Sequence, residues 1–239
     1  MNRGWQVGLM TILWQGVLNL QGQSEDPLVL KGEAMDETMI EPATTSTVDG
    51  AMRIGFKAIM FAFYGNHQAN VDEHMEHIQA AVVQVAGNGI RFWFEIYTAI
   101  SCLHCARSAT GRQLAKYKTF GVQTSKKVKN WIAEGCGNVK HLDLLLDAEL
   151  AVLAGNAKKA RQSYKKSIRT AEKMLRVNDA GLASERYGEY LLEQQGDRKG
   201  AREALTHAIE FYALWGSDLK VESIRSKHEE LLRPLNVIR

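Results

Sequence analysis

Two cysteines, Cys102 and Cys105, are the side chains with the clearest capacity for chemistry in this 239-residue chain. A C-x-x-C pair can act as a redox dithiol or as half of a zinc site, and Cys136 and His141 could complete the metal shell. The pair falls inside a predicted helix, without the βαβ context of the thioredoxin motif. We therefore favour two small core residues over a metal or redox site.

A group of histidines among carboxylates is the second candidate metal site, because His74 and His77 are expected to share one helix face. The H-E-x-x-H pattern of zinc proteases is absent from the sequence, so a solvated polar face is the favoured interpretation. The sequence also contains no P-loop and no protein-kinase motif. We expect neither a cofactor nor enzymatic activity.

Charge is distributed unevenly along the chain, although the net charge is only +3. Residues 112–176 carry 15 basic and 5 acidic side chains, whereas residues 1–50 carry 2 and 7. The basic stretch could contact phosphates, but few aromatic residues accompany it. Repeat proteins also carry charge on their outer faces without binding a partner there. Of the two possible partners, an acidic protein surface is favoured over nucleic acid, which a steep salt dependence of binding would support.

Aromatic side chains crowd two places, and four of them are candidate interaction residues. Phe92, Trp93 and Tyr97 lie on one predicted helix and cover more than one of its faces. Trp215 lies close to the C-terminal end of the chain. Core packing is the default role of such residues, and a docking surface for a protein partner or a missing output domain is the functional alternative.

The elements that hold these residues are predicted to be helices. No proline occurs between residues 43 and 233, a length over which a β-rich protein normally needs proline in its turns. With 45% hydrophobic and 24% charged residues, the chain is also unlike a disordered one. We expect an all-α fold, with an N-terminal helix and an acidic irregular connector in residues 1–50, continuous with a helical array over residues 51–239.

A repeat with an offset of 41 residues gives the array its internal order, since residues 155–168 match residues 196–209. The matched pairs are Gly155 with Gly196, Asn156 with Asp197, Ala160 with Ala201, Tyr164 with Leu205, and Ile168 with Ile209. Each glycine can end a helix and the next residue can cap a new one. The pattern is that of tetratricopeptide repeats, whose usual period is shorter. The longer period requires longer helices or a wider turn between repeats, and we expect residues 175–181 to supply an extra linker.

Residues 1–22 leave two interpretations open. A weakly positive start followed by an apolar run is typical of a secretory signal, but polar residues interrupt the run and no clean cleavage site follows. We favour a packed amphipathic helix and a cytoplasmic protein. The N-terminal helix is apolar on more than one side, so we also expect open ends of the array to allow self-association. The residues that make it so are Trp5, Leu9, Ile12 and Trp14.

Five stretches together resemble the tetratricopeptide-like helical region of large signalling proteins. They are LNLQGQSEDPLVLKGEAMDE at 18–37, KAIMFAFYGNHQANV at 57–71, NVKHLDLLLDAEL at 138–150, LASERYGEYLLEQQGD at 182–197 and ALWGSDLKVESI at 213–224. In that family the region stands between a serine/threonine kinase domain with an AAA-type ATPase module and a GAF/histidine-kinase output domain.

The resemblance implies a right-handed solenoid of antiparallel helix pairs that acts as a non-catalytic scaffold for protein–protein interaction in a signalling assembly. Two alternatives remain. The chain could be an inert fragment of such a kinase–ATPase polypeptide, or a nucleic-acid-binding repeat.

Overall fold

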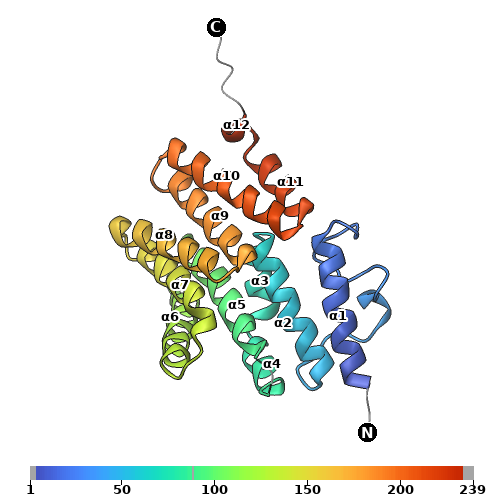
Figure 1. The fold of residues 1–239 in the computed structure, drawn as a ribbon. Coiled ribbons are helices and arrows are strands. Elements are labelled where there is room, and N and C mark those ends of the chain that lie inside the picture. The colour runs from blue at the N-terminus through green and yellow to red at the C-terminus, as the bar shows by residue number, and fades with distance from the viewer. Residues whose placement is uncertain (1–3, 88, 234–239) are drawn as a thin grey trace.

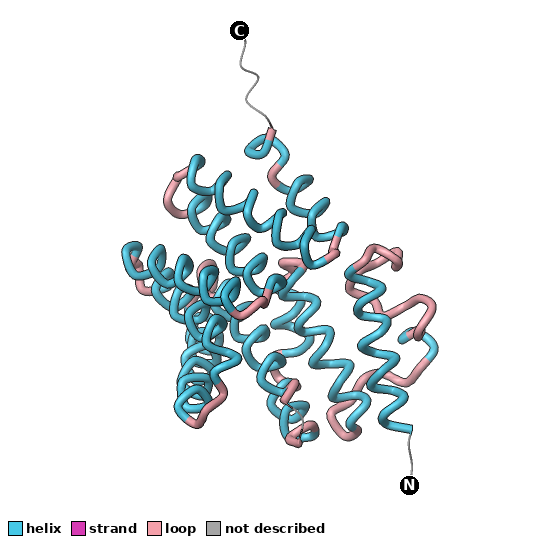
Figure 2. Tube along the Cα trace, in the orientation of Figure 1, coloured by secondary structure: helices cyan, strands magenta, loops and turns pink. Residues whose placement is uncertain are grey.

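The computed structural model describes residues 4–87 and 89–233, and its regular structure there is helical throughout (Figures 1 and 2). The all-α prediction is confirmed. The described residues contain no strand, and their one β-type pairing is an isolated bridge between Lys31 and Asp36. None of the described helices combines the length and hydropathy needed to cross a bilayer.

Residues 4–87 and 89–133 form six helices and a short 3₁₀ turn. They are α1 (Gly4–Leu20), the turn Glu37–Met39, α2 (Val48–Phe63), α3 (His67–His74), α4 (Ile78–Gln84), α5 (Arg91–Cys105) and α6 (Gly111–Ala133). The chain turns between α3 and α4, so His74 ends one helix while His77 precedes the next. The prediction that these two histidines share one helix face is therefore wrong.

The second half continues as stacked helices. They are a 3₁₀ turn Gly137–Val139, α7 (Lys140–Leu153), α8 (Ala157–Lys173), α9 (Val177–Glu193), α10 (Arg198–Trp215), α11 (Asp218–Lys227) and α12 (Glu229–Leu232). Helices α7 with α8 and α9 with α10 are the closest-packed pairs, and each pair corresponds to one copy of the 41-residue repeat (Figure 1).

The turns inside these pairs follow from two residues each. Gly155 and Gly196 have φ of 67° and 62°, a conformation that costs glycine little. The side chain of Asn156 accepts a hydrogen bond from the Lys159 amide, and that of Asp197 from the Gly200 amide. Each turn therefore ends one helix and caps the next.

The remaining repeat positions lie in the core. Ala160 and Ala201 are fully buried, as are Tyr164 and Leu205. Ile168 and Ile209 pack against the same core from partly buried positions.

The long period does not come from an extra linker, so the prediction for residues 175–181 is wrong. Helix α8 ends at Lys173 and α9 already begins at Val177. The extra residues lengthen the helices, because α8 and α9 have 17 residues each and α10 has 18. Leu175, at φ 55°, makes the sharp turn between α8 and α9.

Polar side chains of α1 hold the acidic connector against the array. The Nδ2 group of Asn19 donates hydrogen bonds to the carbonyls of Pro27 (3.1 Å) and Val29 (2.7 Å). Oε1 of Gln15 accepts from the Ala34 amide at 3.0 Å. Helix α1 thus contacts the connector on one side and packs against α2 on another, as the packed-helix interpretation of this segment expects. The first three residues of the alternative signal segment lie outside the described residues.

A Gly55→Ala substitution should destabilise the fold by about 1–3 kcal/mol, because an added Cβ would lie 2.2 Å from the Phe94 ring where α2 meets α5. Urea unfolding measures the difference. Gly137→Ala is the matched control, since a Cβ there meets no atom within 4 Å. Equal stability of the two variants would show that α2 and α5 are not in close contact.

Candidate functional site

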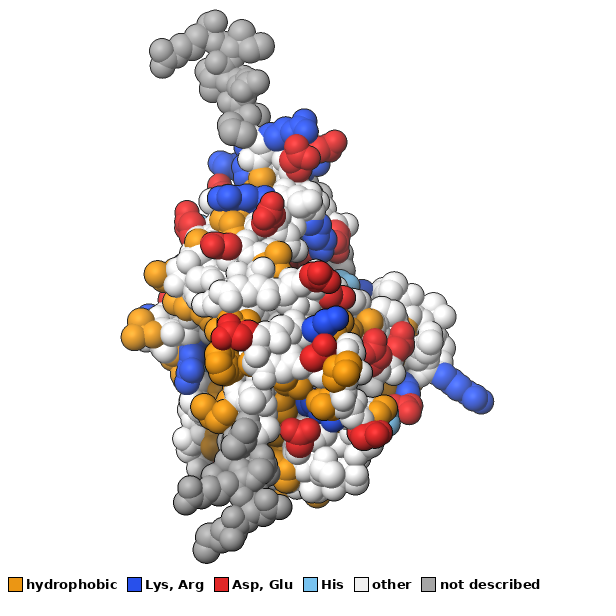
Figure 3. All heavy atoms as spheres, turned by 90° about the vertical axis from the view of Figure 1, so that its right-hand side faces the viewer, with side chains coloured by type: hydrophobic (Ala, Val, Ile, Leu, Met, Phe, Trp, Pro, Cys, Tyr) orange, Lys and Arg blue, Asp and Glu red, His pale blue; other side chains and the backbone are white. Residues whose placement is uncertain are grey.

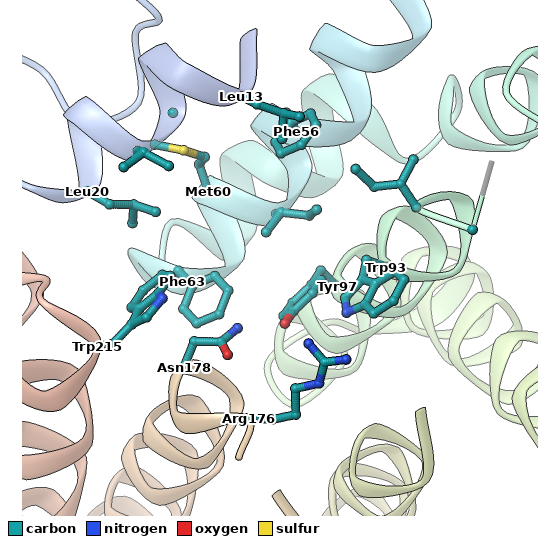
Figure 4. Close-up of a pocket in the computed structure, with 15 residues that line it drawn as sticks. Leu13, Leu20, Phe56, Met60, Phe63, Trp93, Tyr97, Arg176, Asn178 and Trp215 are labelled. Carbon is teal, nitrogen blue, oxygen red and sulfur yellow. The ribbon is translucent and has the colours of Figure 1, made fainter. Parts of the chain in front are cut away.

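A cavity of about 620 Å³ opens between α1, α2, α5 and the neighbouring ends of α9 and α10. We call it the aromatic pocket, because Phe63, Trp93, Tyr97 and Trp215 form its middle (Figure 4). The ring of Phe63 lies 5.2 Å from that of Tyr97 and 5.3 Å from that of Trp215. Side chains from five helices that are distant in sequence therefore enclose one apolar space.

Three of the four predicted interaction residues line this pocket, namely Trp93, Tyr97 and Trp215. The fourth, Phe92, is not part of the pocket lining and packs against Trp131, with 4.5 Å between the ring centres and a tilt of 54° between the rings. The prediction grouped these residues by type, and the fold separates Phe92 from the others.

One end of the aromatic pocket is polar. Arg176 and Asn178, at the start of α9, extend toward the space between Phe63 and Tyr97, whereas Leu13 and Phe56 lie at the opposite end (Figure 4). Arg176 is exposed and makes no ion pair with any residue that the structure describes. The pocket therefore combines a large apolar surface with one positive charge.

A buried carboxylate, Asp179, holds the Tyr97 side chain in place next to this polar end. Asp179 accepts hydrogen bonds from the Tyr97 hydroxyl and from Nε2 of His141, the latter at 2.7 Å. Burial and the Asp179 charge raise the pKa of Tyr97 well above its ordinary value, so the phenol stays protonated. His141 is thus a core residue that joins α7 to α9, not a ligand beside the cysteines.

A larger buried network centres on Arg186 of α9, which is only 1% exposed. Its guanidinium donates two hydrogen bonds to Glu149 of α7, at 3.0 and 3.1 Å. Arg107 also donates to Glu149, as does the Tyr164 hydroxyl at 2.9 Å. Burial alone would raise the pKa of Glu149, but the Arg107 and Arg186 charges outweigh it and lower the pKa to about 2.

Two neutral histidines complete this network. One terminal nitrogen of Arg186 lies 3.2 Å from Nε2 of His67 and 2.8 Å from Nδ1 of His104, and the two imidazoles stack 4.3 Å apart. Burial, reinforced by Arg186, lowers the pKa of His67 well below its ordinary value and that of His104 to about 3. The network therefore uses the two imidazoles as uncharged acceptors.

The predicted metal ligands are separated by the fold. Cys102 and Cys105 are buried beside Val71 and Tyr117, away from the half-buried Cys136. His74 is buried with its ring edge-on to Phe61, and His77 is exposed. Within residues 4–87 and 89–233, no three His, Cys, Asp or Glu side chains are grouped so that they could hold a metal ion.

Several basic side chains of residues 112–176 are paired with neighbouring helices. Lys127 binds the Glu95 carboxylate at 3.0 Å, and Lys129 contacts Asp143 at 2.7 Å and Asp147 at 3.0 Å. Lys116 pairs with Glu76 at 2.7 Å. These three of the 15 basic side chains therefore join α6 to neighbouring segments of this chain.

The buried charges were missed in the sequence because charged residues are usually exposed. The sequence pattern that could have indicated them is a charged residue at a position where the helical periodicity predicts a buried apolar one. Glu149 stands in LLLDAELAVL, and Arg186 between Leu182 and Tyr190. Comparisons with protein-family models, curated proteins and solved structures found no match to this chain.

Stability should fall as the pH drops below about 6.5, because His67 and His104 stay neutral in the folded chain while their unfolded counterparts bind protons. Each such histidine contributes a slope of roughly 1.4 kcal/mol per pH unit. Urea unfolding between pH 7.5 and 5 measures this slope. The slope of the unfolding free energy against pH should be smaller in His104→Gln than in wild type. The control His207→Gln alters an exposed residue and should leave the slope unchanged. Equal slopes in the two variants would contradict the neutral His104.

Thiol labelling should divide the cysteines into two classes. Burial raises the pKa of Cys102 and, to about 11, that of Cys105, so neither should react quickly in the folded chain. A chromogenic disulfide reagent should label one thiol rapidly and two only on unfolding, and Cys136→Ser should remove the rapid reaction. Fast labelling of Cys102 or Cys105 in the native protein would contradict this assignment.

Proposed function

We propose that this protein is a non-catalytic, tetratricopeptide-like scaffold of the cytoplasm that binds another protein through α1. The observation that carries the proposal is an exposed row of apolar side chains on α1, which we call the α1 ridge. It consists of Met10, Trp14 and Val17, which are 64%, 52% and 50% exposed. Their spacing of four and three residues places them on one face.

The other residues of α1 show that the exposed apolar row is not an ordinary solvent-facing surface of a helix. The helix carries no charged residue, and its inner face is occupied, since Ile12 and Leu18 are buried against the array. Figure 3 looks onto the side of the molecule that carries α1, where hydrophobic side chains are exposed between scattered charges. Exposed apolar side chains that gather on one helix face are typical of a protein-binding surface.

The chemistry of the partner follows from the surroundings of the ridge. Residues 1–50 carry 7 acidic and 2 basic side chains, and the connector that holds most of the acidic ones packs beside α1. The surface complementary to the ridge is an apolar helix face, and the acidic balance of residues 1–50 favours a partner that is basic overall. The resemblance to the helical region of signalling kinases adds the expectation that this partner belongs to a signalling assembly.

Replacing exposed side chains of the α1 ridge should weaken the interaction without unfolding the chain. Met10→Ser with Trp14→Ser should reduce capture of the partner roughly tenfold or more, because aromatic anchors dominate binding energy at interfaces. The measurement is quantitative affinity capture from cells that make the protein, compared with wild type. Val83→Ser with Leu214→Ser is the matched control, since both residues are 73% exposed and lie off the α1 ridge.

Light scattering with size-exclusion chromatography is run on the same variants. A partner lost only from the ridge variant supports the scaffold. Equal capture by ridge and control variants contradicts it, and so does a wild-type dimer that the ridge variant dissociates, because the ridge would then bind a second copy.

A further inference from the structure

The aromatic pocket has the dimensions of a small-molecule site. Its volume of about 620 Å³ lies within the range of ligand pockets, roughly 300–1,000 Å³. Such sites are typically lined by apolar and aromatic side chains with a few polar groups that fix orientation. Here Leu13, Phe56 and Met60 provide the apolar end, and Arg176 and Asn178 provide the polar end (Figure 4).

The turn between α8 and α9 positions the cation. The amide of Arg176 donates to the carbonyl of Ala171 at 2.9 Å, while Leu175 takes the left-handed conformation. This arrangement anchors the backbone of Arg176 and leaves its guanidinium at the pocket. Because the side chain has no carboxylate partner among the described residues, its hydrogen-bond donors are available to a ligand.

The nearby carboxylate of Asp179 keeps its negative charge, which the Arg176 guanidinium must outweigh if the pocket is to hold an anion. Asp179 is absent from the pocket lining, and its oxygens are occupied by the Tyr97 hydroxyl, His141 Nε2 and the Asn178 amide nitrogen, the last at 3.2 Å. The amide nitrogen of Asn178 has a second hydrogen to donate. The polar end therefore presents a guanidinium and an amide donor, which match a carboxylate.

We propose that the aromatic pocket binds an amphipathic carboxylic acid, with its apolar chain between α1 and α2 and its carboxylate on Arg176 and Asn178. This occupant is a free small molecule, so the inference goes beyond the protein-binding role of the α1 ridge. Tyr97 closes the wall between the two ends, and its hydroxyl is committed to Asp179.

Isothermal titration with three probes that share a ten-carbon chain tests the head group. The two ions are used below their micelle concentrations and decanol below its solubility limit. Decanoate should bind at least tenfold more tightly than decanol, and decyltrimethylammonium should bind more weakly than either. Arg176→Gln should lower decanoate affinity roughly tenfold and leave decanol affinity unchanged. Arg112→Gln, which alters an exposed arginine outside the pocket, should change neither.

The Gly16→Leu variant tests whether the apolar chain of the ligand lies between α1 and α2. A Cβ at Gly16 would lie 3.8 Å from the Met60 sulfur, so the backbone accepts a side chain there, and the leucine would extend into the pocket. This variant should lose decanoate and decanol together while keeping its circular dichroism spectrum. Equal binding of acid and alcohol by wild type would overturn the carboxylate assignment. No binding of either probe, or undiminished binding by Gly16→Leu, would overturn the site.

Discussion

The burial of Arg186 and Glu149 is the constraint on which the rest of the structure depends. Taking a guanidinium and a carboxylate out of water costs several kcal/mol per ion, and only well-formed pairing and hydrogen bonding compensates. Here Glu149 accepts from Arg186, Arg107 and Tyr164, and Arg186 also reaches His67 and His104. These partners come from α3, α5, the turn after α5, α7, α8 and α9. The charges are stabilised only when all these elements are in place.

Helix α9 connects the buried Arg186 network to the aromatic pocket and, through α11, to the helix that bears the α1 ridge. Of its 17 residues, 13 are buried, including four charged ones. Arg186 fixes its middle and Asp179 its start, which places Arg176 and Asn178 at the aromatic pocket. Lys220 of α11 pairs with Glu185 at 2.8 Å and donates to the Phe63 carbonyl, so α11 is tied to α9 and α2. Ser217 reaches the last carbonyl of α1, at Leu20. Internal polar contacts thus set the position of the helix that exposes the α1 ridge.

Periodicity and turn chemistry predicted the helical class and the two repeat turns, because those features depend on neighbours in sequence. Gly155 and Asn156 determine their turn locally, and so do Gly196 and Asp197. The pocket depends instead on which helices meet, so the sequence could place Trp93 and Trp215 among the candidates but could not bring them together or exclude Phe92. Residues 175–181 were predicted as a linker on the usual repeat length, whereas the chain extends its helices. The pairing of Glu149 with Arg186, 37 positions apart, leaves no local pattern.

Native-state hydrogen exchange of wild type and Arg186→Met tests the central claim most directly. Methionine fills much of the same space without the charge, and it leaves the buried Glu149 with Arg107 as its one cationic partner among the described residues. If the network joins the helices, amides of α5, α7 and α9 should lose protection together, with a common loss of about 3–5 kcal/mol in opening free energy. A loss confined to α9, with α5 and α7 as protected as in wild type, would contradict the account.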